Sequence, residues 1–212
     1  MTSCSAGSGG DDPAGLAACG GGPVPSRTSS PDQPVRDFLD RLASRTATPG
    51  GGGAAAVTAA LAAGLVAMGA RFSATQLPEA GELAVRADEL RRRAVDLADI
   101  DARAYQAVLA APSGQRREAL LGAAAVPLEI SEIGAQVAEM ARLVAEAGNP
   151  NLRGDAVTGV VLAAASARSA ACLVDINVDL GGLEPELSRR AAQAVTAACR
   201  AADRVTAGRG ER

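Results

Sequence analysis

The chain has 212 residues, of which 48% are hydrophobic and only 1% aromatic, and its formal net charge is -3 at pH 7. This length suits one sizeable domain with a core of Ala, Leu and Val. The acidic balance lacks the basic footprint of a nucleic-acid-binding protein. The absence of histidine excludes Ser-His-Asp and Cys-His catalysis and imidazole zinc sites. We therefore expect neither a nucleic-acid partner nor a bound metal.

The first 33 residues are rich in Gly, Ser, Pro and Asp and are predicted to form a disordered tail, because they contain too little apolar surface to offset the entropy of ordering. They lack the basic region and apolar core of a signal peptide. The four cysteines show no paired spacing, which favours reduced thiols. We expect a cytoplasmic protein.

Helical periodicity begins after this tail. A short amphipathic helix is predicted from Pro34 to about Ser44, and an alanine-rich helix follows from Ala54 to Met68. Further helices are predicted over residues 79–111, 115–147, 155–180 and 184–206, each bounded by Pro or Gly signals. No alternating β-branched pattern occurs, so the predicted fold class is all-α, a bundle of about six helices within a domain covering residues 34–207.

A run of four glycines behind a proline directly precedes the alanine-rich helix. Its residues are Pro49, Gly50, Gly51, Gly52 and Gly53. Glycines at the start of a helix leave backbone N–H groups accessible at the positive end of the helix dipole, where they can hold an anion or the edge of a heterocycle. The alternative is a tight corner where two helices touch. The helix itself approaches membrane-span length, but Ala and Gly dominate it, and we interpret it as a buried helix with no membrane partner.

One carboxylate lies where an apolar residue is expected. At about 100° per residue, Asp101 falls on the same line of its helix as Leu83, Leu97 and Val108, and Tyr105 borders that line one turn later. Burial of a carboxyl group in an apolar groove raises its pKa, which suits a general acid or base near neutral pH. The alternative is a structural Asp paired with an arginine of a neighbouring helix.

Two other polar or helix-breaking features stand out. The loop of residues 148–155 contains Asn151 and ends on Asp155, and its simplest interpretation is a helix stop, a turn and Asp155 as the N-cap of the next helix. Pro127 lies inside a predicted helix, where it removes one N–H donor and leaves the carbonyl of Ala123 without its helical partner. A kink is expected there.

Five motifs follow one another over about 170 residues. They are Val35 to Leu42 leading to Thr48-Pro49-Gly50-Gly51-Gly52, then Asp99-Ile100-Asp101-Ala102-Arg103-Ala104-Tyr105, Val126-Pro127-Leu128, Gly148-Asn149-Pro150-Asn151-Leu152, and Asp155. In this order and spacing they resemble the cyclodeaminase/cyclohydrolase family, which includes the cyclodeaminase half of formiminotransferase-cyclodeaminase and bacterial methenyltetrahydrofolate cyclohydrolases.

The resemblance implies a dimer-forming helical enzyme that acts on a one-carbon derivative of tetrahydrofolate, either as a formimidoyltetrahydrofolate cyclodeaminase or as a methenyltetrahydrofolate cyclohydrolase, with no tightly bound cofactor. It implies Asp101 as the principal acid–base residue and Asp155 as its partner or as an acceptor of pterin N–H groups. The implied substrate-binding residues are Pro49, Gly50, Gly51, Gly52, Gly53, Tyr105 and Asn151.

The chain also departs from the family pattern. Gly53 and Ala54 stand where Ser is usual after the glycines, Gly154 replaces a Ser before Asp155, and Leu173 replaces an Asn. Each change removes a hydrogen-bonding group from the expected site. The alternative function is therefore a non-catalytic binding or assembly protein that retains the family fold.

Overall fold

The computed structural model describes residues 34–207, and these form six α-helices and no strand. The prediction of a disordered tail over residues 1–33 concerns residues outside this range. The helices are α1 (Val35–Ala43), α2 (Gly51–Arg71), α3 (Ala80–Ala110), α4 (Arg116–Ala147), α5 (Arg153–Gly181) and α6 (Glu186–Thr206), with short 3-10 turns η2 (Ser113–Gln115) and η3 (Pro150–Leu152). The all-α prediction is confirmed.

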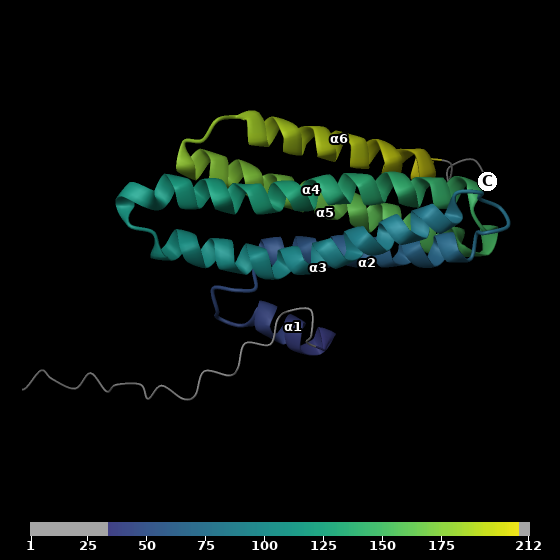
Figure 1. Cartoon of the computed structure of the whole chain (residues 1–212), viewed down its shortest axis with the longest axis horizontal. Helices are drawn as coiled ribbons and strands as arrows, with labels where there is room; N and C mark the ends of the chain where they lie inside the picture. The colour runs from purple at the N-terminus through teal and green to yellow at the C-terminus, as the bar shows by residue number, and fades with distance from the viewer. Residues whose placement is uncertain (1–33, 208–212) are drawn as a thin grey trace, which may run out of the picture.

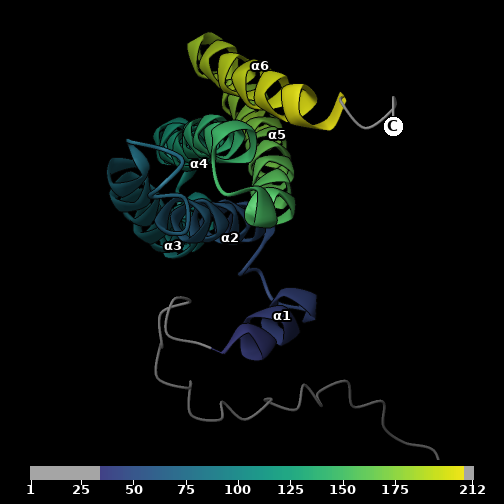
Figure 2. The same cartoon turned by 90° about the vertical axis from the view of Figure 1, so that its right-hand side faces the viewer.

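Five of the helices, α2 to α6, form an elongated bundle, and α1 stands apart from it. Helices α2 to α5 follow one another in alternating directions along the long axis, and α6 lies against α4 and α5 (Figure 1). Seen from the end, α1 is set off from the bundle beyond α2 (Figure 2). Short connections between long helices favour this antiparallel order. The two ends of the bundle are therefore well separated in space.

Helix α2 lies against α3, α4 and α5 and is largely buried, because its small side chains let neighbouring backbones approach closely. The hydroxyl of Ser166 on α5 donates a hydrogen bond to the carbonyl of Ala55, with an Oγ–O distance of 2.7 Å. A β-carbon on Gly134 would lie 2.9 Å from the carbonyl oxygen of Ala163, so α4 and α5 also meet closely. By length and composition alone α2, α4 and α5 are apolar enough to cross a membrane, and more than half of each apolar window is buried in the bundle. The expectation of no membrane partner stays a prediction.

The helix ends agree with the predicted ones to within a few residues, apart from two details. Gly51, Gly52 and Gly53 lie inside the first turn of α2, whose N-cap is Gly50, whereas the sequence suggested a helix beginning at Ala54. The prediction that Asp155 is the N-cap of its helix is wrong. That helix begins at Arg153, and Asp155 lies in its first turn. The η3 turn runs directly into α5, so the helix starts two residues before Asp155 and its carboxylate lies after the N-cap position.

Helix α4 runs through Pro127 without interruption. The carbonyl of Ala123, which loses its helical donor to the proline, accepts a hydrogen bond from the side-chain amide of Asn177 on α5, with an N–O distance of 3.1 Å. Asn177 therefore supplies from a neighbouring helix the donor that Pro127 lacks.

Candidate active site

The site begins where the glycine turn becomes a helix. Pro49 is buried, and the Thr48–Pro49 peptide bond is cis. Gly50 then adopts an extended conformation as the N-cap of α2, and as a glycine it has no side chain with which to cap the first turn. A helix start without a side-chain cap leaves its N–H groups to other acceptors.

Asp101 on α3 lies directly against Gly52. A β-carbon built on Gly52 would overlap three atoms of the Asp101 side chain, namely Oδ1, Cγ and Oδ2. No real β-carbon makes such contacts, so the carboxylate fills the space that any side chain at position 52 would need. Glycine at this position is a steric requirement of where Asp101 lies.

The environment of Asp101 favours the neutral acid. Burial raises the pKa of its carboxyl group, and a hydrogen bond from the backbone N–H of Gly53 opposes that rise in part. The apolar stripe predicted for this helix is confirmed, since Leu97 and Val108 are both buried. Within residues 34–207, no arginine pairs with Asp101. The structural alternative, an Asp paired with an arginine, is not what the structure contains.

This geometry gives Asp101 the properties of a general acid or base. The side chain is half-buried, so it is shielded from bulk water and still open to a ligand. The Gly53 N–H at the start of α2 stabilises the ionised form, so a proton can leave and return. A carboxyl group with a raised pKa next to open backbone is typical of a proton-transfer site.

Two further side chains lie near this end of α2. Leu173 on α5 would be 3.7 Å, measured from its Cδ1, from a β-carbon on Gly51. It therefore forms an apolar wall beside the glycine turn. Tyr105, one helical turn after Asp101, is 46% exposed. The structure thus brings the glycine turn together with Asp101 and Leu173, and Tyr105 follows Asp101 by one turn of α3.

The structure does not bring Asp155 or Asn151 to this place within one chain. The loop that contains Asn151 lies at the far end of α2, where the side-chain amide of Asn149 donates to the carbonyl of Phe72. Asp155 precedes Leu173 by 18 positions on α5, which is roughly 27 Å along a helix axis. The expected pairing of Asp101 with Asp155 is therefore corrected: in a single chain the two carboxylates belong to opposite ends of the bundle. The spacing of residues along each helix contains no information about which helix ends lie together in the bundle.

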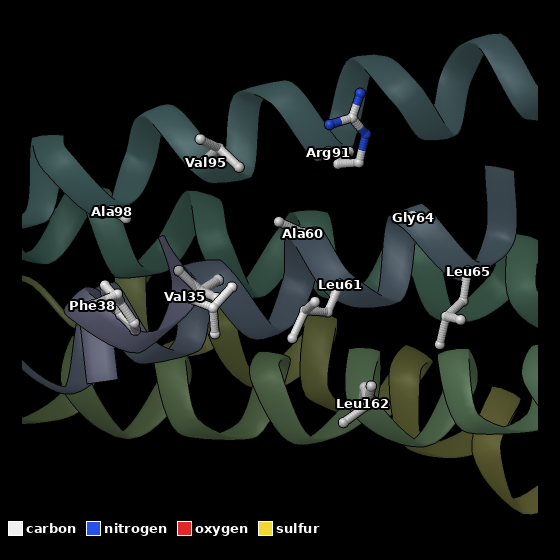
Figure 3. A pocket seen from close by; sticks show the side chains of 11 residues that line it. Val35, Phe38, Ala60, Leu61, Gly64, Leu65, Arg91, Val95, Ala98 and Leu162 are labelled. Atoms are coloured by element: carbon white, nitrogen blue, oxygen red, sulfur yellow. The ribbon is translucent and has the colours of Figure 1, made fainter. Parts of the chain in front are cut away.

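An apolar cavity of about 530 Å³ opens beside the site (Figure 3). It lies between α1 and the bundle, and α2, α3 and α5 supply its other walls. Its lining residues are Val35, Phe38, Val57, Ala60, Leu61, Gly64, Leu65, Arg91, Val95, Ala98 and Leu162. Ala98 connects the cavity to the site, because it precedes Asp101 by one helical turn and its carbonyl oxygen lies 3.9 Å from a β-carbon built on Gly53.

Reasoning from the sequence missed this cavity and the role of Leu173. The sequence does contain a signal for the cavity. The amphipathic helix α1 carries several large apolar residues, more than its packing against the bundle buries. In the structure Phe38 is buried, whereas Val35 and Leu39 stay exposed. Leu173 was recognised only as a departure from a pattern, and its contact with the glycine turn depends on how α5 packs. Among residues 34–207, no three Cys, Asp or Glu side chains gather as a metal site would require.

Comparison with known proteins supports the resemblance seen in the motifs. Residues 34–197 match the protein family described as Formiminotransferase-cyclodeaminase. The chain is 34% identical over 165 residues to methenyltetrahydrofolate cyclohydrolase from Methylorubrum extorquens, and the alignment covers 69% of this chain and 79% of that protein. The fold is similar to the crystal structure of formiminotetrahydrofolate cyclodeaminase from Thermotoga maritima, with a TM-score of 0.76 and 25% identity over 84% of this chain and 98% of that one.

Proposed function

The chain belongs to the formiminotransferase-cyclodeaminase family, and from that premise we propose that it is an enzyme that converts a one-carbon derivative of tetrahydrofolate, with Asp101 as its acid–base residue. The observation that carries the proposal is the position of Asp101. Its carboxyl group has a raised pKa, lies on the glycine turn and accepts the Gly53 N–H.

The cyclodeaminase reaction needs one proton removed and one delivered. The formimino group reacts in its protonated, formiminium form. N10 attacks the formimino carbon, and Asp101 as a carboxylate takes the proton from N10 while the new C–N bond forms. Asp101 as a carboxylic acid then donates this proton to the amino group that departs as ammonia, when the exocyclic C–N bond breaks. The product is 5,10-methenyltetrahydrofolate. One carboxylate acting twice balances the protons, so Asp155 keeps the expected role of an acceptor of pterin N–H groups.

The cyclohydrolase reaction uses the same carbon. Water adds to the methenyl carbon while Asp101 takes one of its protons. Asp101 then donates this proton to N5 as the C–N5 bond breaks, and the second water proton is released to solvent as the hydroxyl of the adduct becomes the formyl group on N10. Both reactions require a base beside the methenyl or formimino carbon, so the position of Asp101 suits either one.

The remaining residues at this end of α2 suit substrate binding. The glycine turn, from Pro49 through Gly53, lets a flat pterin lie close to backbone, and the N–H groups at a helix start favour its electron-rich edges. Tyr105 is exposed one turn beyond Asp101 and is available to stack on or donate to the substrate. No tightly bound cofactor is part of this proposal, and a cytoplasmic location remains its expected setting.

We further propose that the active form is a homodimer. Three large apolar side chains of α5, Val161, Ile176 and Leu180, stay exposed in the part of the chain that the structure describes. The dimer that we propose is two-fold symmetric and brings Asp155 and Asn151 of a second copy to Asp101. In such a dimer Asp155 takes part in the site of the other subunit, which its position within one chain does not allow.

The function is tested with purified protein and two substrates. We expect methenyl absorbance to appear with 5-formiminotetrahydrofolate, or to disappear with 5,10-methenyltetrahydrofolate faster than in buffer. Exchange of Asp101 for Asn is expected to abolish whichever activity is found, whereas exchange of the exposed Asp203 on α6 for Asn leaves it unchanged. Absence of turnover with both substrates would contradict the proposal.

A second candidate function is a non-catalytic binding protein that retains the fold. The observation that favours it is Leu173, which places methyl groups beside the glycine turn where the family pattern has a hydrogen-bonding side chain. The Asp101→Asn variant distinguishes the two functions. If tetrahydrofolate binds to the wild type and to this variant alike, and neither turns a substrate over, the binding function is supported.

A further inference from the structure

The cavity beneath α1 has the size of a small-molecule site. Its volume of about 530 Å³ falls in the range of about 300–1,000 Å³ that small-molecule pockets occupy. Empty space of this size in a packed core would be strongly destabilising. Here it lies between the bundle and a helix that makes few other contacts with the rest of the chain.

The cavity lies about one helical turn from the Asp101 site on each of two helices. On α2, Gly53 lies four positions before Val57 and so shares a helix face with this cavity residue. The N–H of Gly53 is the donor to Asp101. On α3, Ala98 ends the cavity one turn before Asp101. When the reacting atoms of a ligand lie at Asp101, the neighbouring part of the same ligand therefore reaches the cavity.

The walls of the cavity are aliphatic except for one aromatic ring and one cation. Phe38 of α1 turns its ring toward the cavity opposite Val95 and Ala98 of α3 (Figure 3). Such walls suit a flat aromatic group, since they offer contact area and few hydrogen-bonding groups.

The cation is at the edge of this apolar space. Arg91 lines the cavity with its aliphatic carbons, and its guanidinium group is turned away from the apolar walls (Figure 3). Arg91 Nε lies 3.3 Å from Oδ1 of Asp88, and Arg71 pairs with the other oxygen of the same carboxylate. Two guanidinium groups share one carboxylate, so this rim carries a net positive charge and favours an anion.

We propose that this cavity binds the p-aminobenzoyl ring of the tetrahydrofolate substrate, and that the Arg91 rim attracts the carboxylates of the glutamate attached to that ring. The inference rests on the proposed function, because Asp101 fixes where the pterin and its one-carbon group lie. It adds a subsite for the opposite half of the molecule. In this arrangement α1 covers the ring, and Phe38 is its principal contact.

The test uses p-aminobenzoylglutamate, which contains the ring and the carboxylates and lacks the pterin. Binding is measured by calorimetry on the full chain, and circular dichroism confirms that each variant is folded. Gly64→Leu projects a side chain into the cavity, where a β-carbon meets only Cδ of Arg91 at 3.7 Å. Val95→Phe fills it from α3. We expect each to weaken binding of the probe at least tenfold and to raise KM for the folate without lowering kcat to the same extent.

The matched control is Gly122→Leu, a glycine on the exposed face of α4 with no atom within 4 Å of its β-carbon position. This variant is expected to bind the probe as the wild type does. Arg91→Gln is expected to weaken binding of the probe severalfold and to leave binding of its neutral diamide unchanged. Arg86→Gln removes an ion pair with Glu89 on the same helix and is expected to change neither affinity.

The outcomes separate this inference from the proposed function. If folates turn over and the two filling variants keep wild-type probe affinity and KM, the subsite is wrong and the function stands. If the probe binds and the filling variants block it, but no folate turns over, the subsite stands and the function falls. Absence of probe binding to the wild type at millimolar concentration would also overturn the subsite.

Discussion

The carboxylate of Asp101 lies where the side chain of residue 52 would be, overlapping the β-carbon position of Gly52. These two residues are almost fifty positions apart in the sequence. They fit each other because Gly52 has no side chain and the carboxyl group of Asp101 fills the space that one would take. The adjacent Gly53 N–H donates to this carboxylate. A helix start and a buried acid thus form one unit, whose function depends on the packing that holds them together.

Gly52→Ala is expected to displace the carboxylate of Asp101, because two groups cannot share the same space. We expect kcat to fall on the order of a hundredfold, as for a reacting group misplaced by about 1 Å. The free energy of unfolding should fall by about 1–3 kcal/mol, as for an overpacked core. Steady-state kinetics and a thermal melt measure both effects.

The matched control for this change is Gly122→Ala on the exposed face of α4. It should keep wild-type activity and gain about 0.5–1 kcal/mol, because Ala is the better helix former. Equal activity of Gly52→Ala and Gly122→Ala would show that Asp101 does not depend on the glycine.

The raised pKa of Asp101 predicts how stability depends on pH. A carboxyl group whose pKa is higher in the folded than in the unfolded chain favours folding when protonated, so its contribution is present at low pH and is lost as pH rises through the folded pKa. Asp101→Asn removes this loss. The Tm of the variant should exceed that of the wild type by a growing margin above about pH 4, the ordinary value for Asp, and the margin should level off above the folded pKa.

Thermal melts of both proteins at matched ionic strength measure this margin. Asp203→Asn, an exposed carboxylate on α6, should run parallel to the wild type across the pH range. A margin for Asp101→Asn that shrinks with rising pH would mean that the folded chain stabilises the carboxylate, and the raised pKa would be wrong.

Asn177→Leu is expected to cost about 1–3 kcal/mol of unfolding free energy, because the buried carbonyl of Ala123 loses its donor. In a Pro127→Ala background the cost should be smaller, since the substituted alanine restores a backbone N–H for that carbonyl. The double-mutant cycle should therefore give a coupling energy on the order of 1 kcal/mol. Purely additive effects in urea unfolding would show that Asn177 does not act through this carbonyl.

Mixed dimers test whether Asp155 serves the site of the other subunit. Asp101→Asn and Asp155→Asn are each expected to be inactive alone. When the two are unfolded together and refolded, half of the dimers are mixed and each carries one intact site, so about a quarter of the wild-type activity should return. No recovery, with mixed dimers demonstrated by differential tags, would exclude a site shared between subunits. Full activity of Asp155→Asn alone would exclude Asp155 from the site.

Much of the fold could be predicted from the sequence, because helices that alternate with Pro and Gly signals leave little freedom in where they start and stop. Pro78 and Gly148 each lie within about two residues of a predicted and observed helix boundary. The inward position of Asp101 also followed from helical spacing alone, since Leu97 and Val108 define its face and both are buried.

The relation between distant segments could not be predicted in this way. Spacing places Asp155 and Asp101 each on a face of its own helix. It contains no information about which end of α5 lies beside Asp101, and in the structure that end is at Leu173, roughly 27 Å along α5 from Asp155. The same holds for Leu173 and Gly51, and for the cavity beneath α1. Pairings of this kind depend on tertiary packing, which the periodicity of single helices does not report.

The central claim is that Asp101 transfers protons during conversion of a tetrahydrofolate derivative, and the kcat of Asp101→Asn tests it most directly. With the wild type active on 5-formimino- or 5,10-methenyltetrahydrofolate, we predict that kcat of the folded variant falls by about 10²–10⁴, while probe binding in the cavity beneath α1 is retained. A folded Asp101→Asn protein that turns the substrate over at the wild-type kcat would contradict the account.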